Sequence, residues 1–430
     1  MYQMRVLSTD AVKSIGKEVK LAGWIRLRRD HGKLIFLDLR DRGGLIQLVV
    51  SPKASEEAYK AASELRPEDV IEAKGVVKKR PAGTVNKELK TGEIEVEVAS
   101  IKLISKAETL PLDMGAEDLN LELPTLLDHR SLTLRHPKIA SIFKVQEQLV
   151  DSFRKTAKEL GCTEVFVPTI VSSATEGGAE VFKINYYDHD AYLSQSPQLY
   201  KQMLVPVFER VYTISKAYRA EPSVTTRHLS ENTQMDCEFG FVEFDELLDL
   251  LEKVASEIVK VDKTARIPKK IPRLTLSEAF EVLKKKEEND LSPQDEADLS
   301  KWALEKHGSD LLTVHHFPTK KRAFYTMPDP KNPKVSLSYD VLFRGLEIAS
   351  GSQRINDHKE LISAIKDRGL NPENFGMYLM AFKYGMPPEG GFSFGLERIT
   401  MKIAGLQNVR EASLFPRDME RVDERFSKDR

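Results

Sequence analysis

The segment from Tyr212 to Glu243 carries charged side chains in a pattern that suits the binding of phosphate and ammonium groups. Two stretches of alternating character flank a polar loop, and alternation with period two is typical of paired strands. On the first stretch Arg219 and Glu221 share a face, and the loop carries Arg227 and His228. An antiparallel pair with cationic and acidic groups on one face can hold a polyanion beside an ammonium group. The alternative is a hairpin whose solvent face carries ordinary ion pairs.

The second stretch separates apolar from polar side chains. If it forms a strand, one face packs in a core and the other is free for chemistry. The apolar face would carry Met235, Cys237, Phe239 and Phe241, and the polar face Gln234, Asp236 and Glu238.

Two acids lie near a potential turn in the segment YDVLFRGLEIASGSQR. If Arg344–Gly345 forms a tight turn, Asp340 and Glu347 become diagonal neighbours on one face of a hairpin. Two carboxylates, with phosphate oxygens completing an octahedron, suit Mg²⁺. The alternative is that these acids only balance the charge of Arg344.

The composition sets broad limits on function. The chain has 430 residues, enough for two or more domains, and 41% of them are hydrophobic. Its 65 basic and 66 acidic residues nearly cancel, so any nucleic-acid partner must be bound by a local patch. Cys162 and Cys237 are the only cysteines and lack metal-ligand spacing, which fits a reducing compartment. We find neither a signal peptide nor an apolar run of membrane-spanning length, and we therefore expect a cytoplasmic protein without a membrane partner.

Residues 1–104 show the pattern of a small β-barrel. Strand-like runs are predicted at Val19–Arg28, Leu34–Arg40, Leu45–Val50, Val70–Lys78 and Gly92–Leu103. A helix is predicted at Ser55–Leu65, between the third and fourth strands. Five strands with a helix after the third is the order of an OB-fold, whose open face commonly binds single-stranded nucleic acid.

Exposed aromatic side chains on this barrel indicate a base-stacking surface. In the second strand the alternation puts Phe36 outside, and in the first it puts Trp24, Arg26 and Arg28 outside. Aromatic rings among arginines suit base stacking combined with phosphate neutralisation. The alternative is that Phe36 only covers one end of the barrel.

The rest of the chain is predicted to form a larger α+β domain after a connector. Residues 105–137 are rich in proline and leucine, which indicates a segment packed between domains. Residues 138–430 should begin with a helix at Ile139–Leu160 and a strand at Thr163–Val167 that stops at Pro168. Residues 245–335 are charged and are predicted to form a helical insertion. The fold class is therefore α+β, an OB-fold followed by an antiparallel sheet flanked by helices.

Three segments, in this order, resemble the motifs of a known enzyme family. The helix and strand that end at Pro168, the hairpin with Arg219 and Glu221, and the segment GGFSFGLERI (Gly390–Ile399) resemble motifs one, two and three of class II aminoacyl-tRNA synthetases. An OB-fold ahead of that domain resembles the subgroup that charges aspartate, asparagine and lysine. Within it, QSPQLYKQ (Gln195–Gln202) resembles the aspartyl enzymes, although the chain lacks the large insertion typical of their bacterial forms.

This resemblance implies an aspartate–tRNA ligase that activates L-aspartate with ATP and transfers it to the 3′ end of tRNA(Asp). An asparaginyl enzyme is the alternative within the family, favoured by Glu389 and opposed by Lys201. From another class, a catalytically idle OB-type RNA-binding protein could retain the same scaffold, but the intact arginines and acids of the three motifs argue against it. Motif one resembles a unit that pairs across a two-fold axis, which implies a homodimer.

Activation joins two anions, so positioning and charge neutralisation carry the chemistry and no general base is required. By resemblance the catalytic residues are Arg219, which bridges the α-phosphate and the substrate carboxylate, and Arg398, which contacts the γ-phosphate from the first turn of a helix. Gly390, Gly391 and Gly395 are expected to allow close approach of a nucleotide. The residues implied in ATP binding are Arg219, Glu221, Arg227, His228, Leu229, Glu347, Gly395, Leu396, Glu397 and Arg398.

Aspartate selection needs cations for a second carboxylate. By resemblance Lys201 and Arg354 read the side chain, because a bidentate guanidinium favours a planar carboxylate over an amide. Asp236 is implied to hold the α-ammonium, and Glu176 belongs to a loop that closes over the amino acid. The implied aspartate-binding residues are Glu176, Gln198, Lys201, Arg219, Asp236, Ser350 and Arg354. The implied Mg²⁺ ligands are Asp340, Glu347 and Ser350.

One residue departs from the family pattern. Where aspartyl enzymes typically read PPHGG, this chain reads PPEGG, with Glu389 in place of a histidine near the substrate carboxylate. A second acid there would repel aspartate unless it points away, pairs with a cation or is protonated.

For the anticodon, the resemblance implies that the barrel stacks on and reads the central bases. The implied residues are Arg29, His31, Phe36, Gln47 and Glu93. In bacterial-style barrels of this family, a histidine at the position of His31 often accompanies relaxed recognition, in which tRNA(Asn) is also charged with aspartate. Such an enzyme would need a partner amidotransferase. Alternatively, His31 is an ordinary loop residue.

Overall fold

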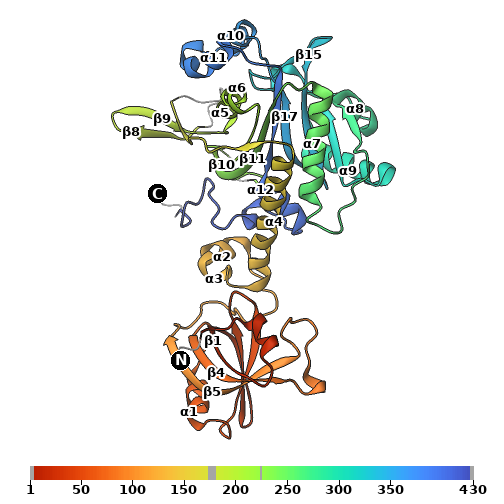
Figure 1. The fold of residues 1–430 in the computed structure, drawn as a ribbon. Helices are drawn as coiled ribbons and strands as arrows, with labels where there is room; N and C mark the ends of the chain where they lie inside the picture. The colour runs from red at the N-terminus through yellow and green to blue at the C-terminus, as the bar shows by residue number, and fades with distance from the viewer. Residues whose placement is uncertain (1–3, 173–180, 223–224, 427–430) are drawn as a thin grey trace. The chain divides into compact units, whose positions relative to one another are not determined.

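The fold consists of two compact units, which a computed structural model describes over residues 4–172, 181–222 and 225–426. The first unit is Met1–Glu122 and the second is Leu123–Arg430 (Figure 1). Residues 105–137, expected to form a connector, are therefore divided between the two units. In the described part of the chain, none of the helices has both the length and the apolar character that a membrane span requires.

The first unit contains a closed five-stranded barrel in the order β1-β2-β3-β5-β4. Its elements are β1 (Glu18–His31), β2 (Leu34–Arg40), β3 (Leu45–Val50), α1 (Glu56–Glu64), β4 (Val70–Lys79) and β5 (Ile94–Ser105). Alternation along β2 places Ile35, Leu37 and Leu39 in the barrel core, where each is at most 2% exposed. Ser55 caps α1 by accepting a hydrogen bond from the Ala58 amide. The expected OB-fold order of strands and helix is confirmed.

A β-bulge in β1 changes which arginines share a face with Phe36. The register shifts between Ile25 and Leu27, so that Arg29 lies opposite Phe36 and Arg28 opposite the buried Leu37. Since directly opposed residues of an antiparallel pair project from the same face, Arg29 and not Arg28 accompanies Phe36. Arg28 instead donates to the carbonyl of Leu65 beside α1. The prediction that Arg28 lies beside Trp24 on the outer face is wrong, because simple alternation does not allow for the extra residue.

The second unit is built on an eight-stranded sheet in the order β12-β13-β16-β17-β18-β11-β10-β6. Its strands are β6 (Thr163–Glu164), β10 (Arg210–Tyr218), β11 (Glu231–Gly240), β12 (Arg273–Thr275), β13 (Leu311–His315), β16 (Ser338–Phe343), β17 (Leu346–Gln353) and β18 (Glu389–Gly395). The central pairs are antiparallel, and only the two outermost pairs, β6 with β10 and β12 with β13, are parallel. The predicted α+β class with a mainly antiparallel sheet is confirmed.

Three helices cover one face of this sheet (Figure 1): α4 (Pro137–Glu159), α7 (Phe244–Val259) and α12 (Leu396–Ile403). The core beneath them contains Phe153 of α4, Leu251 of α7 and the apolar side of β11, with Met235 and Cys237 fully buried. The polar side of β11 therefore faces away from these helices, as the alternation of its sequence predicts. The site described below lies on that opposite face.

Short elements complete the second unit. They are α2 (Leu123–Asp128), α3 (Arg130–Thr133), β7 (Ile170–Val171), β8 (Lys183–Tyr186), β9 (His189–Leu193), α5 (Gln198–Met203), α6 (Val205–Phe208), α8 (Leu276–Leu283), α9 (Pro293–His307), β14 (Pro328–Asp329), β15 (Asn332–Ser336), α10 (His358–Asp367) and α11 (Gly376–Lys383). Residues 245–335, expected to be helical, also supply β12 and β13 to the main sheet. The predicted strand at Thr163–Val167 is shorter than expected, because only its first two residues pair with β10.

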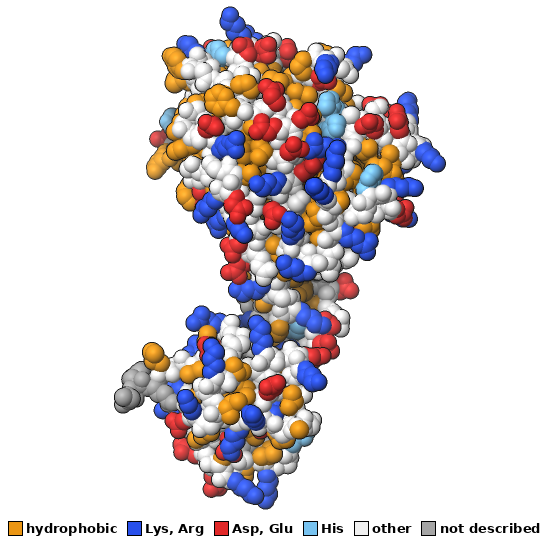
Figure 2. All heavy atoms as spheres, turned by 45° about the vertical axis from the view of Figure 1, so that its right-hand side comes forward, with side chains coloured by type: hydrophobic (Ala, Val, Ile, Leu, Met, Phe, Trp, Pro, Cys, Tyr) orange, Lys and Arg blue, Asp and Glu red, His pale blue; other side chains and the backbone are white. Residues whose placement is uncertain are grey.

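Charged side chains of both signs are interspersed on the surface of each unit in the view of Figure 2. This distribution agrees with the nearly equal numbers of basic and acidic residues in the sequence. Binding of an anionic partner therefore cannot depend on the net charge of the chain.

Candidate active site

Two adjoining cavities lie on the polar face of the eight-stranded sheet. The first, which we call the arginine cavity, has a volume of about 280 Å³ and is lined by Arg219, Arg227 and Arg398 among others. The second, the lysine cavity, has a volume of about 380 Å³ and includes Lys201 and Arg354. Both cavities are lined by Arg219, Gln234, Glu347, Ser350 and Ser393.

Arg219 lies where the two cavities meet. It directly follows β10, and its backbone amide donates to the Ser230 carbonyl at 2.9 Å, which continues the pairing of β10 with β11. Among the described residues, its guanidinium has no hydrogen-bond or ion-pair partner. Because the backbone of Arg219 is fixed and its guanidinium is unpaired, this side chain can bind an anion that spans both cavities.

The arginine cavity holds its two other arginines in place with acidic and carbonyl groups. Arg398 donates to Oε2 of Glu347 at 3.2 Å, and to the carbonyl of Arg227 at 3.4 Å. Arg227 donates to Oε1 of Glu296 at 2.9 Å. Oε2 of Glu296 accepts from the backbone amide of Glu347, also at 2.9 Å. The Glu296 carboxylate therefore connects the loop after β10 with the start of β17.

His228 lies beside these cations, and its surroundings disfavour the charged form of its ring. Burial lowers the pKa of its imidazole, and the positive charges of Arg398 and Arg219 lower it further, although Glu221 opposes the change. Its Nδ1 is 2.7 Å from the Thr225 hydroxyl. The contact with Thr225 thus fixes the ring beside the arginines.

Most residues expected to bind ATP come together in the arginine cavity. Those among its lining residues are Arg219, Glu221, Arg227, His228, Leu229, Glu347, Gly395, Glu397 and Arg398. Leu396 does not line it and instead belongs to the apolar core. The backbone amide of Thr233 donates to Oε1 of Glu397 at 3.1 Å and to Oε2 at 3.0 Å. These hydrogen bonds connect the start of α12 to β11.

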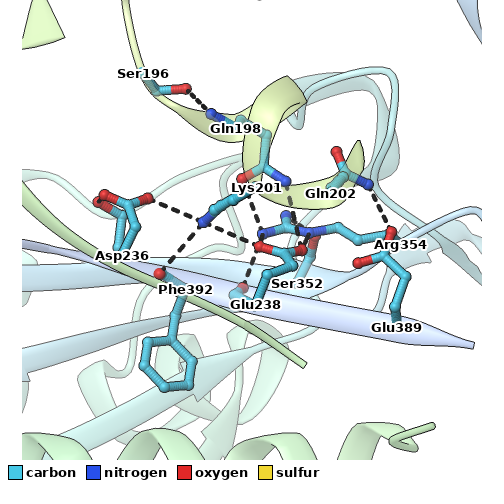
Figure 3. Close-up of polar contacts among 12 residues, drawn as sticks. Ser196, Gln198, Lys201, Gln202, Asp236, Glu238, Ser352, Arg354, Glu389 and Phe392 are labelled. Carbon is cyan, nitrogen blue, oxygen red and sulfur yellow. Dashed lines mark hydrogen bonds and ion pairs between the residues drawn. The ribbon is translucent and has the colours of Figure 1, made fainter. Parts of the chain in front are cut away.

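The lysine cavity contains a buried network of alternating charges (Figure 3). Lys201 Nζ lies 2.9 Å from Oδ1 of Asp236 and 3.0 Å from Oε2 of Glu238. Arg354 Nε donates to Oε1 of Glu238 at 2.8 Å, and its other nitrogens donate to Gln198 Oε1 and the Ser352 hydroxyl. The expected residues Gln198, Lys201, Asp236, Ser350 and Arg354 all line this cavity. Glu176 lies outside the described residues.

The two cations keep Glu238 ionised. Burial disfavours its charge, but Arg354 and Lys201 outweigh burial and lower the pKa of Glu238 to about 2. Burial also opposes the charge of Lys201, and the carboxylates of Asp236 and Glu238 outweigh it, so that the pKa of Lys201 is raised. Two anions and two cations therefore balance one another in the network.

Glu389, the residue that departs from the family pattern, is fully buried beside this network. Its Oε1 accepts a hydrogen bond from Gln202 Nε2 at 2.6 Å. Burial raises the pKa of Glu389 well above its ordinary value, and the charge of Glu238 raises it further. Of the three conditions under which aspartate could bind beside this acid, protonation is the one that its surroundings favour.

Two of the three glycines of β18, Gly390 and Gly391, make room for side chains of the protein itself. A Cβ on Gly391 would lie 2.1 Å from Oε2 of Glu238, and one on Gly390 would lie 2.4 Å from Leu247 Cδ2. By contrast, a Cβ on Gly395 would make only ordinary contacts with Arg398. Gly391 is thus required by the position of Glu238.

The hairpin of β16 and β17 carries the expected metal ligands. Arg344 and Gly345 form its turn, both with positive φ, as a two-residue hairpin turn requires. A bulge shifts the register, so that Asp340 lies opposite Ser350. Asp340 Oδ2 accepts from Arg322 at 2.7 Å, whereas its Oδ1 is buried without a hydrogen-bond partner among the described residues. Burial raises the pKa of Asp340 to about 6, although Arg322 opposes the shift.

Several residues that line or support the two cavities were not expected from the sequence. Glu238 was placed on the polar face by alternation but was given no role, and Gln234 and Ser393 line both cavities. Arg322 and Glu296 reach the site from segments with no recognisable motif. Their contacts with Asp340 and Arg227 are formed only by the folded chain.

The barrel has a separate cavity of about 470 Å³ on its surface. Four of the five residues expected to read the anticodon line it: Arg29, His31, Phe36 and Gln47. The fifth, Glu93, is exposed outside the cavity, whereas Glu95 lines it and accepts from Gln47 Nε2 at 3.1 Å. The rings of His31 and Phe36 meet edge to face, with centroids 5.7 Å apart.

Comparisons with known proteins agree with this geometry. The family described as tRNA synthetases class II (D, K and N) matches residues 122–419, and the OB-fold nucleic acid binding domain matches residues 19–104. A relative from Archaeoglobus fulgidus, named aspartate–tRNA(Asp/Asn) ligase, is 39% identical and covers 97% of this chain and 100% of the relative. A relative from Pyrococcus abyssi, named aspartate–tRNA(Asp) ligase, is 38% identical over 95% of this chain and 96% of its own length.

A solved structure is similar over almost the whole chain. The asparaginyl-tRNA synthetase of Pyrococcus horikoshii, complexed with asparaginyl-adenylate, superposes with a TM-score of 0.87 and 31% identity, covering 98% of this chain and 100% of that one. Sequence family, relatives and fold agree over both units. The chain therefore belongs to the class II tRNA synthetases of the D, K and N group, which are ATP-dependent ligases.

Proposed function

We propose that this protein is an aspartate–tRNA ligase, which forms aspartyl-adenylate from L-aspartate and ATP and transfers the aspartyl group to tRNA(Asp). The observation that carries this proposal is the unpaired guanidinium of Arg219 at the junction of the two cavities. ATP in the arginine cavity and aspartate in the lysine cavity would both contact it. The names of the relatives support aspartate as the amino acid.

In this reaction the α-carboxylate of aspartate attacks the α-phosphorus of ATP, and pyrophosphate leaves. Arg219 neutralises the charge of the two reacting groups and aligns them, so no proton has to be removed. Arg398 and Arg227 neutralise the outer phosphates. Arg398 projects from the first turn of α12, where helix amides also favour anions.

The lysine cavity suits an amino acid with an anionic side chain. Asp236 binds the α-ammonium, while Lys201 and Arg354 attract the side-chain carboxylate. An amide side chain gains less from two cations, which favours aspartate over asparagine. Asparagine remains the competing substrate, because the similar solved structure carries asparaginyl-adenylate.

The surroundings of Asp340 fit a Mg²⁺ ion. Its buried, unpartnered Oδ1 lies near Glu347 and Ser350, and oxygen ligands of this kind are those that Mg²⁺ prefers. Among the described residues, no three His, Cys, Asp or Glu side chains are grouped to hold a metal alone, so phosphate oxygens of ATP would complete its shell. When bound there, Mg²⁺ would neutralise phosphate charge.

The barrel cavity is the proposed anticodon site. Phe36 and His31 supply rings for base stacking, and the amide of Gln47 and the carboxylate of Glu95 supply groups that read base edges. The relatives include enzymes named for tRNA(Asp) alone and for both tRNA(Asp) and tRNA(Asn), so we propose tRNA(Asn) as a second substrate. An amidotransferase would then convert the aspartyl-tRNA(Asn), and the cytoplasm would be the site of this chemistry.

We also propose that the chain works as a homodimer through α4 and the segment that ends at Pro168. Phe166 in that segment is 87% exposed, which suits a surface covered by a second copy. Light scattering at micromolar concentration should show a dimer. A stable monomer would contradict this assembly.

Pyrophosphate exchange tests the proposed function directly. With purified protein, ATP and Mg²⁺, exchange should depend on aspartate and be much weaker with asparagine. Charging of tRNA(Asp) and tRNA(Asn) transcripts with each amino acid then defines the tRNA range. Exchange that prefers asparagine would reject the aspartate assignment.

A further inference from the structure

Glu389 is a buried acid with few groups to stabilise a negative charge. Its side chain comes from the first residue of β18 and points toward Arg354 and Glu238 in Figure 3. Oε1 accepts from Gln202 Nε2, and the Tyr378 hydroxyl holds Gln202 by donating to its Oε1 at 3.0 Å. Oε2 is buried and accepts no hydrogen bond from a described donor. The carboxyl group is within hydrogen-bonding reach of the Glu238 carboxylate.

Two carboxylates in buried contact cannot both remain ionised without a large cost. A single proton between them removes the repulsion and forms a strong hydrogen bond. Glu238 contacts two cations, with Lys201 at 3.0 Å and Arg354 at 2.8 Å. Glu389 has no such contact with a cation among the described residues. The proton therefore belongs on Glu389, and Glu238 is the acceptor.

We propose that Glu389 is held as a neutral carboxylic acid that donates a hydrogen bond to Glu238, and that it thereby acts as a positioning residue for aspartate selection. This inference rests on the proposed function of the lysine cavity. Glu238 orients Arg354 and Lys201, so a donor that fixes Glu238 also fixes the cations that read the side chain of the substrate.

The charge balance explains why the proton matters for the substrate. Lys201 and Arg354 offset Asp236 and Glu238, so the network is neutral when Glu389 is protonated. Aspartate adds two carboxylates and one ammonium group. If Glu389 ionised, a further negative charge would oppose the side-chain carboxylate of aspartate, whereas a neutral asparagine side chain would be affected less.

The groups facing Glu389 come from each element packed around it. They are Glu238 of β11, Arg354 directly after β17, Gln202 of α5 and Tyr378 of α11, and the ring of Tyr325 lies against Arg354. Burial is the largest cause of the raised pKa of Glu389, the Glu238 charge adds to it, and Arg354 opposes it. As the pH rises through this pKa, the acid ionises and the proposed hydrogen bond to Glu238 is lost.

Two substitutions separate the proton from the shape of the side chain. In Glu389→Gln, the amide oxygen can accept from Gln202 and the amide nitrogen can donate to Glu238, so the variant mimics the protonated acid without titrating. In Glu389→Leu both hydrogen bonds disappear. We expect Glu389→Leu to raise the KM for aspartate about tenfold or more, because a buried partner is left unsatisfied, while the KM for ATP changes less than about twofold.

Steady-state pyrophosphate exchange across the alkaline pH range provides the selective readout. The wild-type KM for aspartate should rise with pH more steeply than that of Glu389→Gln, and the preference for aspartate over asparagine should fall in the wild type only. Titrations of Lys201 and of the substrate amine are common to both proteins and cancel in the ratio. Equal pH profiles for the two proteins would overturn the proposal.

Infrared difference spectroscopy tests the proton without relying on activity. At neutral pH, the wild type minus Glu389→Gln spectrum should contain the C=O band of a protonated carboxylic acid, shifted in D₂O. A carboxylate band in its place would overturn the proposal whatever the substrate. If the band is present but the wild type does not activate aspartate, the proposed function fails and the role in aspartate selection fails with it.

Discussion

Arg227 donates a hydrogen bond to Oε1 of Glu296 at 2.9 Å, which joins the loop after β10 to helix α9. The second oxygen of Glu296 accepts from the Glu347 amide, so one carboxylate orients both a cation and an acid of the arginine cavity. We infer that α9 sets the geometry of the nucleotide site, although none of the sequence motifs includes it.

Replacing Glu296 by Gln should therefore weaken ATP binding selectively. The glutamine amide has nearly the same shape as the Glu296 carboxylate but carries no charge, so the charge-assisted hydrogen bond to Arg227 is lost. We therefore expect the KM for ATP to rise about fivefold to tenfold. The KM for aspartate should stay within about twofold, since its pocket is intact. Glu305→Gln, an exposed position on the same helix, serves as the control. Equal effects on both substrates would argue against this role.

Arg219 and Arg398 should each be necessary for adenylate formation. Substitution of either by Ala removes a fixed positive charge from the developing phosphate transition state, which should lower the rate of pyrophosphate exchange about a hundredfold or more. Arg368→Ala, on an exposed arginine of the same unit, should leave exchange unchanged. Near-normal exchange in both cavity variants would reject the roles proposed for them.

Lys201→Met tests the choice of amino acid. Removal of the buried cation leaves Asp236 and Glu238 without one of their partners. The negative charges of these two acids would then repel the carboxylates of aspartate. The KM for aspartate should rise about a hundredfold or more, far beyond any change for ATP, because an unpaired buried charge costs several kcal/mol. Thermal unfolding measured in parallel separates this effect from a general loss of stability. An unaltered KM for aspartate would exclude Lys201 as a reader of the substrate.

Phe36→Ala should separate tRNA recognition from amino-acid activation. Loss of one stacking contact costs roughly 1–3 kcal/mol, so kcat/KM for tRNA(Asp) charging should fall about fivefold to a hundredfold. Pyrophosphate exchange should be preserved, since the substitution lies in the first unit. Trp24→Ala removes another exposed aromatic ring of the barrel, one that does not line the cavity, and is the matched control. A similar loss in both variants would indicate damage to the barrel.

His31 provides the test of tRNA range. Its ring contacts Phe36 in the barrel cavity and can lie beside a base of the anticodon. We expect aspartate to be transferred to tRNA(Asn) transcripts, and His31→Leu to reduce this charging at least about threefold more than the charging of tRNA(Asp). If the wild type leaves tRNA(Asn) uncharged, relaxed recognition is wrong.

Elements that depend on short-range pattern were predictable from the sequence. The strands Leu34–Arg40 and Leu45–Val50 have the predicted boundaries, because their alternation is regular and turns bound them. The faces of β11 were assigned correctly from Gln234 to Phe239 for the same reason. The prediction for Phe241 is wrong, because β11 ends at Gly240, and Phe241 has a positive φ and is 69% exposed. Motif resemblance then identified most lining residues of the arginine cavity, but fewer than half of those of the lysine cavity.

Contacts between distant segments were not predictable. Arg227 and Glu296 are 69 residues apart, and nothing in the composition of α9 indicates that one of its acids faces the cavity. The need for glycine at Gly391 beside Glu238 was not foreseen, because the clash of a Cβ with Glu238 exists only once β11 and β18 are paired. Likewise, only the folded neighbourhood of Glu389 shows which of the alternatives for this acid applies.

The bulge in β1 has a consequence for how the anticodon surface can vary among related chains. Ile25 and Leu27 lie opposite Leu39 and Asp38, which are consecutive residues of β2, so the residue between them has no counterpart across the ladder. A chain that lost Arg26 would keep the same pairing, with Arg29 still opposite Phe36. Loss of one residue at this point is therefore expected to preserve which side chains share a face with Phe36. Loss of one residue three positions later would instead move the side chains that follow to the opposite face of the strand.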